Sequence, residues 1–138
     1  MKHGAQELAE SGIRAMYAED RVSQALGMQV AEVHPGAARV TMVVRADMVN
    51  GHHVCHGGVI FALADSAFAF ACNSYGAMTV AAGATIDFLR PVRIGDHLVA
   101  VAVERSQGRR TGVYDVTVQN QAGETVALFR GRSHRSAA

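Results

Sequence analysis

Hydrophobic and polar positions alternate along the chain with a helical period in some segments and a period of two in others. The places where the period changes mark the boundaries of the predicted helices and strands. Near the N-terminus the spacing is helical, so residues 1–20 are expected to hold a short helix. Between residues 28 and 44, two strand-like runs meet at a His-Pro-Gly turn. Residues 57–73 are apolar almost all round, which is typical of a buried helix, and Gly76 is its expected stop.

After this helix the period changes to two, which is typical of β-strands. The first run ends at Arg90-Pro91, where proline interrupts strand pairing, and three alternating runs follow with short turns between them. In one of these runs Val99, Val101 and Val103 share a face. The short turns predict that the last four strands form an antiparallel meander. The whole pattern predicts an α+β fold in which about six antiparallel strands wrap around one long central helix.

Length and composition are those of one globular domain spanning residues 1–138. The two cysteines, Cys55 and Cys72, are too few for a disulfide framework. The N-terminus carries acidic residues and lacks the apolar core of a secretory signal. The apolar run at residues 57–72 is shorter than the roughly 20 residues that a membrane span needs. A soluble, cytoplasmic protein without a membrane partner is therefore expected.

Charge is divided unevenly along the chain, although the net charge is only +1. Residues 1–89 carry five basic and eight acidic residues, whereas residues 90–138 carry eight arginines and four acidic residues. Arginine suits forked contacts with phosphate, so the second part either forms a solvated strand surface or binds an anionic ligand. The arginines are interleaved with strand residues, and no basic tract or aromatic stacking motif is present. Nucleic acid is therefore not the expected partner.

One acidic residue, Asp65, interrupts the most apolar segment of the chain. An ionised carboxylate in apolar surroundings costs several kcal/mol unless it is paired, and its pKa rises if it is not. No basic residue lies within two turns of Asp65 on the predicted helix, so it has no partner at helical spacing. Three roles stay open for this side chain: pairing with a distant buried arginine, contact with water, or a chemical function.

The start of the same helix carries a second feature, the sequence His56-Gly57-Gly58. A helix N-terminus offers unpaired N–H groups and a positive dipole end, and glycine lets a ligand oxygen approach. Such a terminus can polarise a carbonyl and stabilise the oxyanion formed when it is attacked, although a glycine pair also serves close packing. Gly57 and Asp65 lie about 12 Å apart along a helix. One carbonyl therefore reaches both only where two antiparallel copies of the helix meet in a dimer with two equivalent sites.

Longer motifs make the chain resemble the PaaI-type phenylacetic acid degradation thioesterases, within the hotdog-fold thioesterases. The resemblance covers nearly the whole chain from Ala25 onward. Its motifs are N-G-x-x-x-C-H-G-G-x-x-F-A-L-A-D-S-A-F-A at residues 50–69, T-I-D-F-L-R-P at 85–91, T-G-V-Y-D at 111–115 and V-A-L-F-R-G-R-S-H-R at 126–135. The H-G-G and L-A-D elements mark the superfamily, and the longer string is much more specific. The fold of this family, the hotdog fold, agrees with the order of elements predicted above.

The resemblance implies hydrolysis of acyl-CoA thioesters, with coenzyme A as part of the substrate and no separate cofactor. It implies that Asp65 is the catalytic carboxylate, as general base on water or as nucleophile, and that the Gly57 N–H polarises the thioester carbonyl. His56 and Asn50 would then orient the substrate and the water. The family also implies a homotetramer, built as a dimer of dimers.

One position departs from the family pattern. Some relatives supply a hydroxyl from the strand after the helix, where this chain offers only Thr85, so positioning of the water would fall to Asn50 or Ser66. The resemblance also offers coenzyme A, with its pyrophosphate and 3′-phosphate, as the ligand of the arginine-rich part. The candidate contacts are Arg90, Arg93, Arg109 and Arg110. The implied substrate is phenylacetyl-CoA or a ring-hydroxylated relative, and medium-chain acyl-CoA is the alternative.

Other functions stay open for the same residues. The loop at residues 52–56 holds three histidines and a cysteine, which invites a zinc site. Ligands so close together do not all reach one ion, so no metal is expected. A Cys55-His56 nucleophilic pair is weak because adjacent side chains rarely point at each other, and dehydration of hydroxyacyl thioesters needs a histidine placed differently. A non-catalytic acyl-CoA binding module would keep the arginines and the apolar pocket but would not need Asp65.

Overall fold

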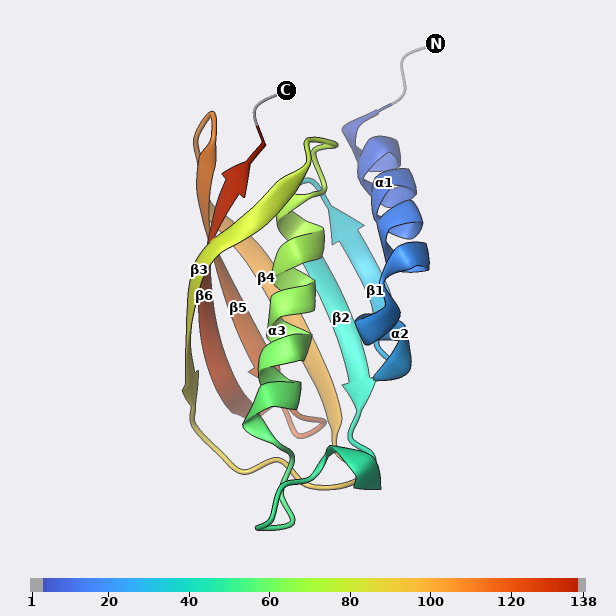
Figure 1. Ribbon diagram of the computed structural model, residues 1–138, viewed down its shortest axis with the longest axis vertical. Coiled ribbons are helices and arrows are strands. Elements are labelled where there is room, and N and C mark those ends of the chain that lie inside the picture. Colours follow the sequence, from blue (N-terminus) through green and yellow to red (C-terminus); the bar gives the residue numbers. More distant parts are fainter. Residues whose placement is uncertain (1–3, 137–138) are drawn as a thin grey trace.

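The computed structural model describes residues 4–136, in which helices precede and interrupt a set of strands (Figure 1). The helices are α1 (Ala5–Glu19), α2 (Arg21–Ala25) and α3 (Gly57–Cys72), with a short 3-10 turn, η1 (Ala46–Met48), ahead of α3. The strands are β1 (Gln29–His34), β2 (Ala37–Val43), β3 (Thr79–Phe88), β4 (His97–Gln107), β5 (Thr111–Gln119) and β6 (Thr125–Arg135). Residues 1–3 of the expected N-terminal segment lie outside this description. The hydrophobic pattern predicted these elements apart from α2 and η1.

The described strands form one antiparallel sheet in the order β1-β2-β4-β5-β6-β3. The sheet curls around α3, which contacts all six strands (Figure 1). Helices α1 and α2 lie to one side of α3, next to β1. The expected α+β fold, with a sheet wrapped around one long central helix, is confirmed.

The expected meander of the last four strands is wrong for β3. Strands β4, β5 and β6 do form a meander, but β3 pairs with β6 at the far edge of the sheet. Residues 89–96 carry the chain from β3 to β4 across the open end of the curled sheet, beside the start of α3 (Figure 1). Val92 in this segment is buried, and its carbonyl accepts a hydrogen bond of 2.6 Å from the Cys55 N–H. Because the sheet curls, a short segment can cross it and also close the end of the core.

Helix α3 can be enclosed because small and aromatic side chains alternate on its buried surface. Phe68 packs against Tyr114 and Phe129, with ring centroids 5.8 Å apart in both pairs. On β6, a Cβ at Gly131 would lie 2.8 Å from the Phe68 ring. Only glycine therefore lets this strand approach the helix so closely.

Helix α3 ends at Cys72, ahead of the expected stop at Gly76. The Asn73 side chain terminates it: Nδ2 donates to the Ala69 carbonyl at 2.9 Å, and Oδ1 accepts from the Thr79 N–H at 2.9 Å. This amide joins the end of the helix to the first residue of β3. Gly76 instead occupies the following turn with a φ of 88°, a left-handed conformation that glycine adopts without strain.

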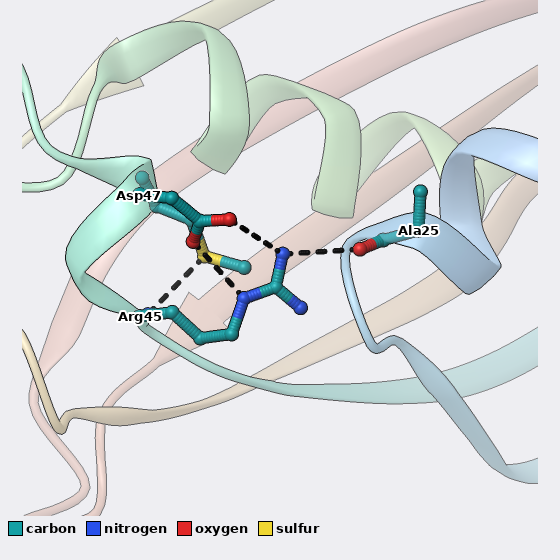
Figure 2. Close-up of polar contacts among 4 residues, drawn as sticks. Ala25, Arg45 and Asp47 are labelled. Carbon is teal, nitrogen blue, oxygen red and sulfur yellow. Dashed lines mark hydrogen bonds and ion pairs between the residues drawn. The ribbon is translucent and has the colours of Figure 1, made fainter.

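The N-terminal helices are tied to the rest of the fold at two places. Gln6 on α1 donates from Nε2 to the Val33 carbonyl of β1 at 2.7 Å, so α1 covers part of that sheet edge. Arg45 lies between the end of α2 and η1 (Figure 2). Its guanidinium donates to the Ala25 carbonyl at 3.0 Å and pairs with Asp47 at 3.0 Å. The segment before α3 is therefore anchored to α2.

The helices within residues 4–136 do not reach the length and apolarity that crossing a lipid bilayer requires. Helix α3, the most apolar, has 16 residues, fewer than the roughly 20 of a membrane span. A cytoplasmic location stays a prediction.

Candidate active site

The start of α3 leaves one backbone donor free. His56 is the N-cap residue, and its Nδ1 accepts a hydrogen bond of 2.8 Å from the Gly58 N–H. The His56 carbonyl accepts from the N–H groups of Val59 and Ile60. The Gly57 N–H has no hydrogen-bond partner among the described residues. Because it also lies at the positive end of the helix dipole, this donor is suited to bind a carbonyl oxygen.

Gly57 lines a pocket of about 350 Å³ beside the segment that crosses from β3 to β4. Asn50 and Arg90 line the same pocket, so the structure brings together three of the predicted site residues. Phe88 forms an aromatic wall that the sequence reasoning missed, and a Cβ on Gly57 would lie 3.2 Å from its ring. The signal available for Phe88 was its place at the end of a strand that leads into the site.

Asn50 uses one end of its side-chain amide to shape the loop before α3. Its Oδ1 accepts hydrogen bonds from the backbone N–H groups of His52 at 2.9 Å and Val54 at 3.4 Å, which holds a tight turn. His53 in this turn has a φ of 63°. The Asn50 Nδ2 group has no partner within residues 4–136, so it stays available to donate to a substrate or a water.

Asp65 lies about two turns along α3 from Gly57, at roughly 12 Å on a helix, and does not line that pocket. The carboxylate is partly buried and has no hydrogen bond or ion pair among the described residues. Burial, and after it the negative charge of Asp20, raises the pKa of Asp65 above its ordinary value. Pairing with a buried arginine, one of the three roles considered, is not what the described chain shows. One subunit therefore presents the two halves of the predicted site apart from each other.

The two candidates for a water-positioning hydroxyl do not line the pocket. The Ser66 hydroxyl lies 2.9 Å from the Ser23 hydroxyl of α2, so it is engaged with the N-terminal segment. Thr85 of β3 is exposed, while its neighbour Ile86 packs against the core. Because alternate side chains of a strand point to opposite faces, Thr85 points away from α3. Of the candidates named from the sequence, Asn50 is the one at the pocket.

The four predicted arginines are not gathered in one place. Arg90 and Arg93 lie in the crossing segment beside the pocket, and Arg90 also pairs with Glu124 at 3.4 Å. Arg109 and Arg110 lie in the β4–β5 turn, at the opposite end of the sheet (Figure 1). Within one subunit a phosphate group therefore reaches one pair or the other, and the role of each arginine in binding coenzyme A stays a prediction.

The histidine-rich loop does not assemble a metal site: within residues 4–136, no three His, Cys, Asp or Glu side chains are grouped to hold an ion. Cys55 is buried, and burial raises the pKa of its thiol to about 11. The Cys55 thiol donates to the His56 carbonyl at 3.7 Å, while the His56 ring accepts from Gly58. A Cys55-His56 nucleophilic pair is therefore not formed.

Comparison with known proteins identifies the family. Residues 52–127, which include the start of α3 and Asp65, match the family model of the thioesterase superfamily. The acyl-coenzyme A thioesterase PaaI of Escherichia coli is 56% identical over 121 residues, 88% of this chain and 86% of the relative. The chain belongs to the thioesterase superfamily.

Solved structures agree with this assignment. That of E. coli PaaI, described as coming from the phenylacetic acid degradation operon, is similar to this thioesterase with a TM-score of 0.96 at 51% identity, covering 98% of both chains. A Streptococcus mutans protein bound to acetyl CoA has a TM-score of 0.77 at 29% identity, over 80% of this chain and 89% of that chain. The hotdog fold and the resemblance to PaaI-type thioesterases are confirmed. The chain is therefore an enzyme of the thioester hydrolase class.

Proposed function

We propose that this thioesterase hydrolyses acyl-CoA thioesters to a free acid and coenzyme A, with phenylacetyl or hydroxyphenylacetyl as the acyl group, in phenylacetate breakdown. One observation carries the proposal. A partly buried carboxylate, Asp65, and a backbone donor, the Gly57 N–H, both lack partners among the described residues and lie on one helix of a thioesterase. The name of the E. coli relative supports the substrate class. Residues 1–138 act as one domain, and coenzyme A belongs to the substrate, so no cofactor takes part.

In the proposed reaction the thioester carbonyl oxygen accepts a hydrogen bond from the Gly57 N–H. Asp65 takes a proton from water as the water oxygen attacks the carbonyl carbon. Negative charge then develops on the carbonyl oxygen at the positive end of a helix dipole, where it is stabilised. The C–S bond breaks, and the coenzyme A thiolate takes the proton from Asp65. In the alternative route the carboxylate attacks the carbonyl itself, and the C–S bond breaks to release the coenzyme A thiolate. Water then hydrolyses the resulting anhydride to the free acid and the Asp65 carboxylate, and the proton released goes to the thiolate.

Two further side chains prepare this arrangement. His56 caps the Gly58 N–H, which leaves the Gly57 N–H as the donor available to the carbonyl. The Asn50 Nδ2 group orients the water or the thioester from the pocket wall. Neither side chain needs to exchange a proton in this scheme.

The separation of Gly57 from Asp65 requires a second subunit, and β3 offers the place for it. This ten-residue strand has β6 on one side and no strand on the other within residues 4–136. Large apolar side chains along and beside it are 49–71% exposed: Met78, Val80, Phe88 and Leu89. Long apolar edge strands are prone to pair with another chain. In our proposal two β3 strands pair antiparallel about a two-fold axis, Asp65 of each subunit faces Gly57 of the other, and two such dimers form the tetramer.

The same dimer gives the distant arginines a role. The C-terminal end of one α3 would point toward the pocket of the other subunit, and Arg109 and Arg110 lie at that end. Their replacement by alanine should raise KM more than it lowers kcat, because they would bind ground state and transition state alike. A double alanine variant of Arg14 and Arg39, which removes the same charge elsewhere, should keep the wild-type KM. An unchanged KM in the Arg109/Arg110 variant would remove these residues from the site.

Thiol release from a panel of acyl-CoA esters tests the activity directly. We expect the highest kcat/KM for phenylacetyl-CoA or a hydroxyphenylacetyl-CoA, and a fall in kcat of at least about 10²–10⁴-fold in Asp65→Asn. A preference for medium-chain esters would assign the alternative substrate class. Binding of acyl-CoA without thiol release would show a non-catalytic binding module and would overturn the proposal.

A further inference from the structure

A chain of hydrogen bonds joins the N-terminal segment to the turn of α3 that carries Asp65. Ser23 of α2 is fully buried, and its hydroxyl lies 2.6 Å from Asp20 Oδ2 and 2.9 Å from Ser66 Oγ. The other oxygen of Asp20, Oδ1, accepts the Ser23 N–H at 2.9 Å and so caps α2. Ser66 directly follows Asp65 in α3.

The Asp20 carboxylate, at one end of this chain of hydrogen bonds, determines which group donates in each of them. A carboxylate accepts hydrogen bonds and does not donate them, so the Ser23 hydroxyl donates to Asp20. The Ser66 hydroxyl must then donate to Ser23. Ser23 is buried and its two partners are partly buried, and a satisfied network in which every member has one role is rigid. It holds the turn of α3 with Asp65 at a set position relative to α2.

The same network brings a second negative charge near the catalytic carboxylate. The charge of Asp20 adds to burial in raising the pKa of Asp65. Cys72 is the other titratable group that interacts electrostatically with Asp65, and burial is the main cause of its raised thiol pKa. Arg21, beside Asp20 on α2, is exposed. Within the described chain neither carboxylate has an ion pair that would offset this repulsion.

We propose that Asp20 and Ser23 are positioning residues for the catalytic base: through the Ser66 hydroxyl they fix the turn that carries Asp65, and they place a second negative charge beside it. This inference rests on the proposed function of Asp65. It gives the N-terminal segment a part in the reaction, although that segment does not reach the Gly57 pocket.

Helix α2 is held at its other end as well, which a positioning role requires. The Arg45 guanidinium, ion-paired with Asp47, donates to the carbonyl of Ala25, the last residue of α2 (Figure 2). The helix is thereby fixed against α3 at its start and against the segment before the site at its end.

Two variants separate the charge from the hydrogen bonds. Asparagine at position 20 can still cap α2 through Oδ1, and its Nδ2 would donate to the Ser23 hydroxyl. Asp20→Asn therefore removes the charge and keeps both contacts, although the Ser23 hydroxyl then donates to Ser66 instead of accepting from it. Its kcat/KM profile should lose activity at lower pH than the wild type does, because Asp65 without the neighbouring charge holds its proton less tightly. Ser23→Ala should lower kcat about 10-fold with little change in KM, since a displacement of about 1 Å can cost as much as about 10²-fold.

Glu19→Gln is the matched control, since it removes a charge one residue earlier, at an exposed position. Its pH profile should equal that of the wild type. If Ser23→Ala does not fold, Ser66→Ala breaks the same contact from the other side. A melting curve for each variant establishes that the fold is kept.

A titration of the Asp65 carboxyl carbon by NMR follows the charge effect without turnover. We expect a lower midpoint in Asp20→Asn than in the wild type. Equal midpoints, or wild-type kcat in both serine variants, would overturn the inference. If the midpoint shifts but the wild type releases no thiol from acyl-CoA, the proposed function fails and the coupling of Asp20 to Asp65 stands.

Discussion

Asp65 and the Gly57 N–H are polar groups that the folded subunit leaves without partners in the described chain. Protein interiors generally satisfy such groups, because an unpaired buried donor or acceptor costs free energy. Gly57 and Asp65 are both partly exposed, so neither group is used in holding the subunit together and each stays open to substrate and water. This is the residue-level reason to connect both with catalysis rather than with folding.

Asp65→Asn should raise stability while it removes turnover. The pKa of Asp65 in the folded chain is above its ordinary value, so the folded state binds this proton more tightly than the unfolded state. The ionised group therefore lowers the free energy of unfolding at neutral pH. That cost fades as pH falls through the folded-state pKa and is absent below the ordinary one. Calorimetry should find a higher Tm for the variant at pH 7 and a smaller difference in acid.

The opposite result would assign Asp65 a structural role. Loss of one partner of a buried ion pair destabilises a protein by about 3–5 kcal/mol. A drop in Tm of that size, with activity lost only as the fold is lost, would contradict the catalytic role.

Gly57→Ala should damage the site through its neighbour. The added Cβ would lie 3.2 Å from the Phe88 ring, and that ring is half exposed and can move within the pocket it lines. We expect kcat/KM to fall by about 10²-fold and stability by no more than about 1–3 kcal/mol. Gly51→Ala is the control, because a Cβ there meets no atom within 4 Å. Equal kinetics for the two variants would show that the close approach of Phe88 to Gly57 is not needed in the site.

At the scale of elements, the start of α3 contains both the N-cap side chain, His56, and the backbone donor proposed to bind the thioester carbonyl, the Gly57 N–H. His56→Ala leaves the Gly58 N–H without its acceptor and should cost about 0.5–2 kcal/mol, with a lower kcat because the first turn frays. Asparagine is a good N-cap, so His56→Asn should restore stability. Urea unfolding and kcat on both variants check this. Recovery of kcat as well in His56→Asn would limit His56 to capping, and a persistent loss would show that the imidazole acts on the substrate.

The helices and strands could be predicted from the sequence because each has its own hydrophobic period. Which strands pair with each other could not be predicted in this way. A short connection after β3 favoured a hairpin, whereas the curled sheet lets residues 89–96 cross its open end. Strand β4 shows the same limit at one face. Hydrophobic residues alternate regularly on both of its faces, and the structure buries Leu98, Ala100 and Ala102 rather than the valines between them. Two alanines on the inner face let α3 pack closely against β4, and this contact depends on the tertiary fold.

The candidate site was predictable where its chemistry lies in a local motif. The H-G-G sequence contains both the cap and the free donor, and Asp65 is conspicuous in an apolar helix. The Ser23–Ser66 contact gave no signal, because its partners are 43 residues apart in the chain. The two arginine pairs lie far apart because of strand direction and sheet curvature, so their spacing in the sequence did not predict this separation.

At the scale of the molecule, the open edge of the sheet is expected to join two subunits. Ala84 is exposed near the middle of β3, so Ala84→Lys would bring two like charges together across a two-fold axis. Sedimentation should find this variant to be a monomer. The variant should keep normal secondary structure and show no thioesterase activity. Ala31→Lys, exposed on the opposite edge strand β1, should stay oligomeric and active. A fully active Ala84→Lys monomer would sink the shared-site arrangement.

The distance between Gly57 and Asp65 on α3 also predicts how two different variants behave when their subunits are mixed. If each site takes one residue from each subunit, a mixed dimer of Asp65→Asn and Gly57→Ala subunits gathers both defects in one site and leaves the other intact. Two impaired proteins, mixed in equal amounts, unfolded and refolded together, would then regain wild-type activity at about one quarter of their sites by random pairing. Enzymes whose sites lie within one chain show no such complementation, so recovery of activity in the mixture would show that each site takes Gly57 from one subunit and Asp65 from the other.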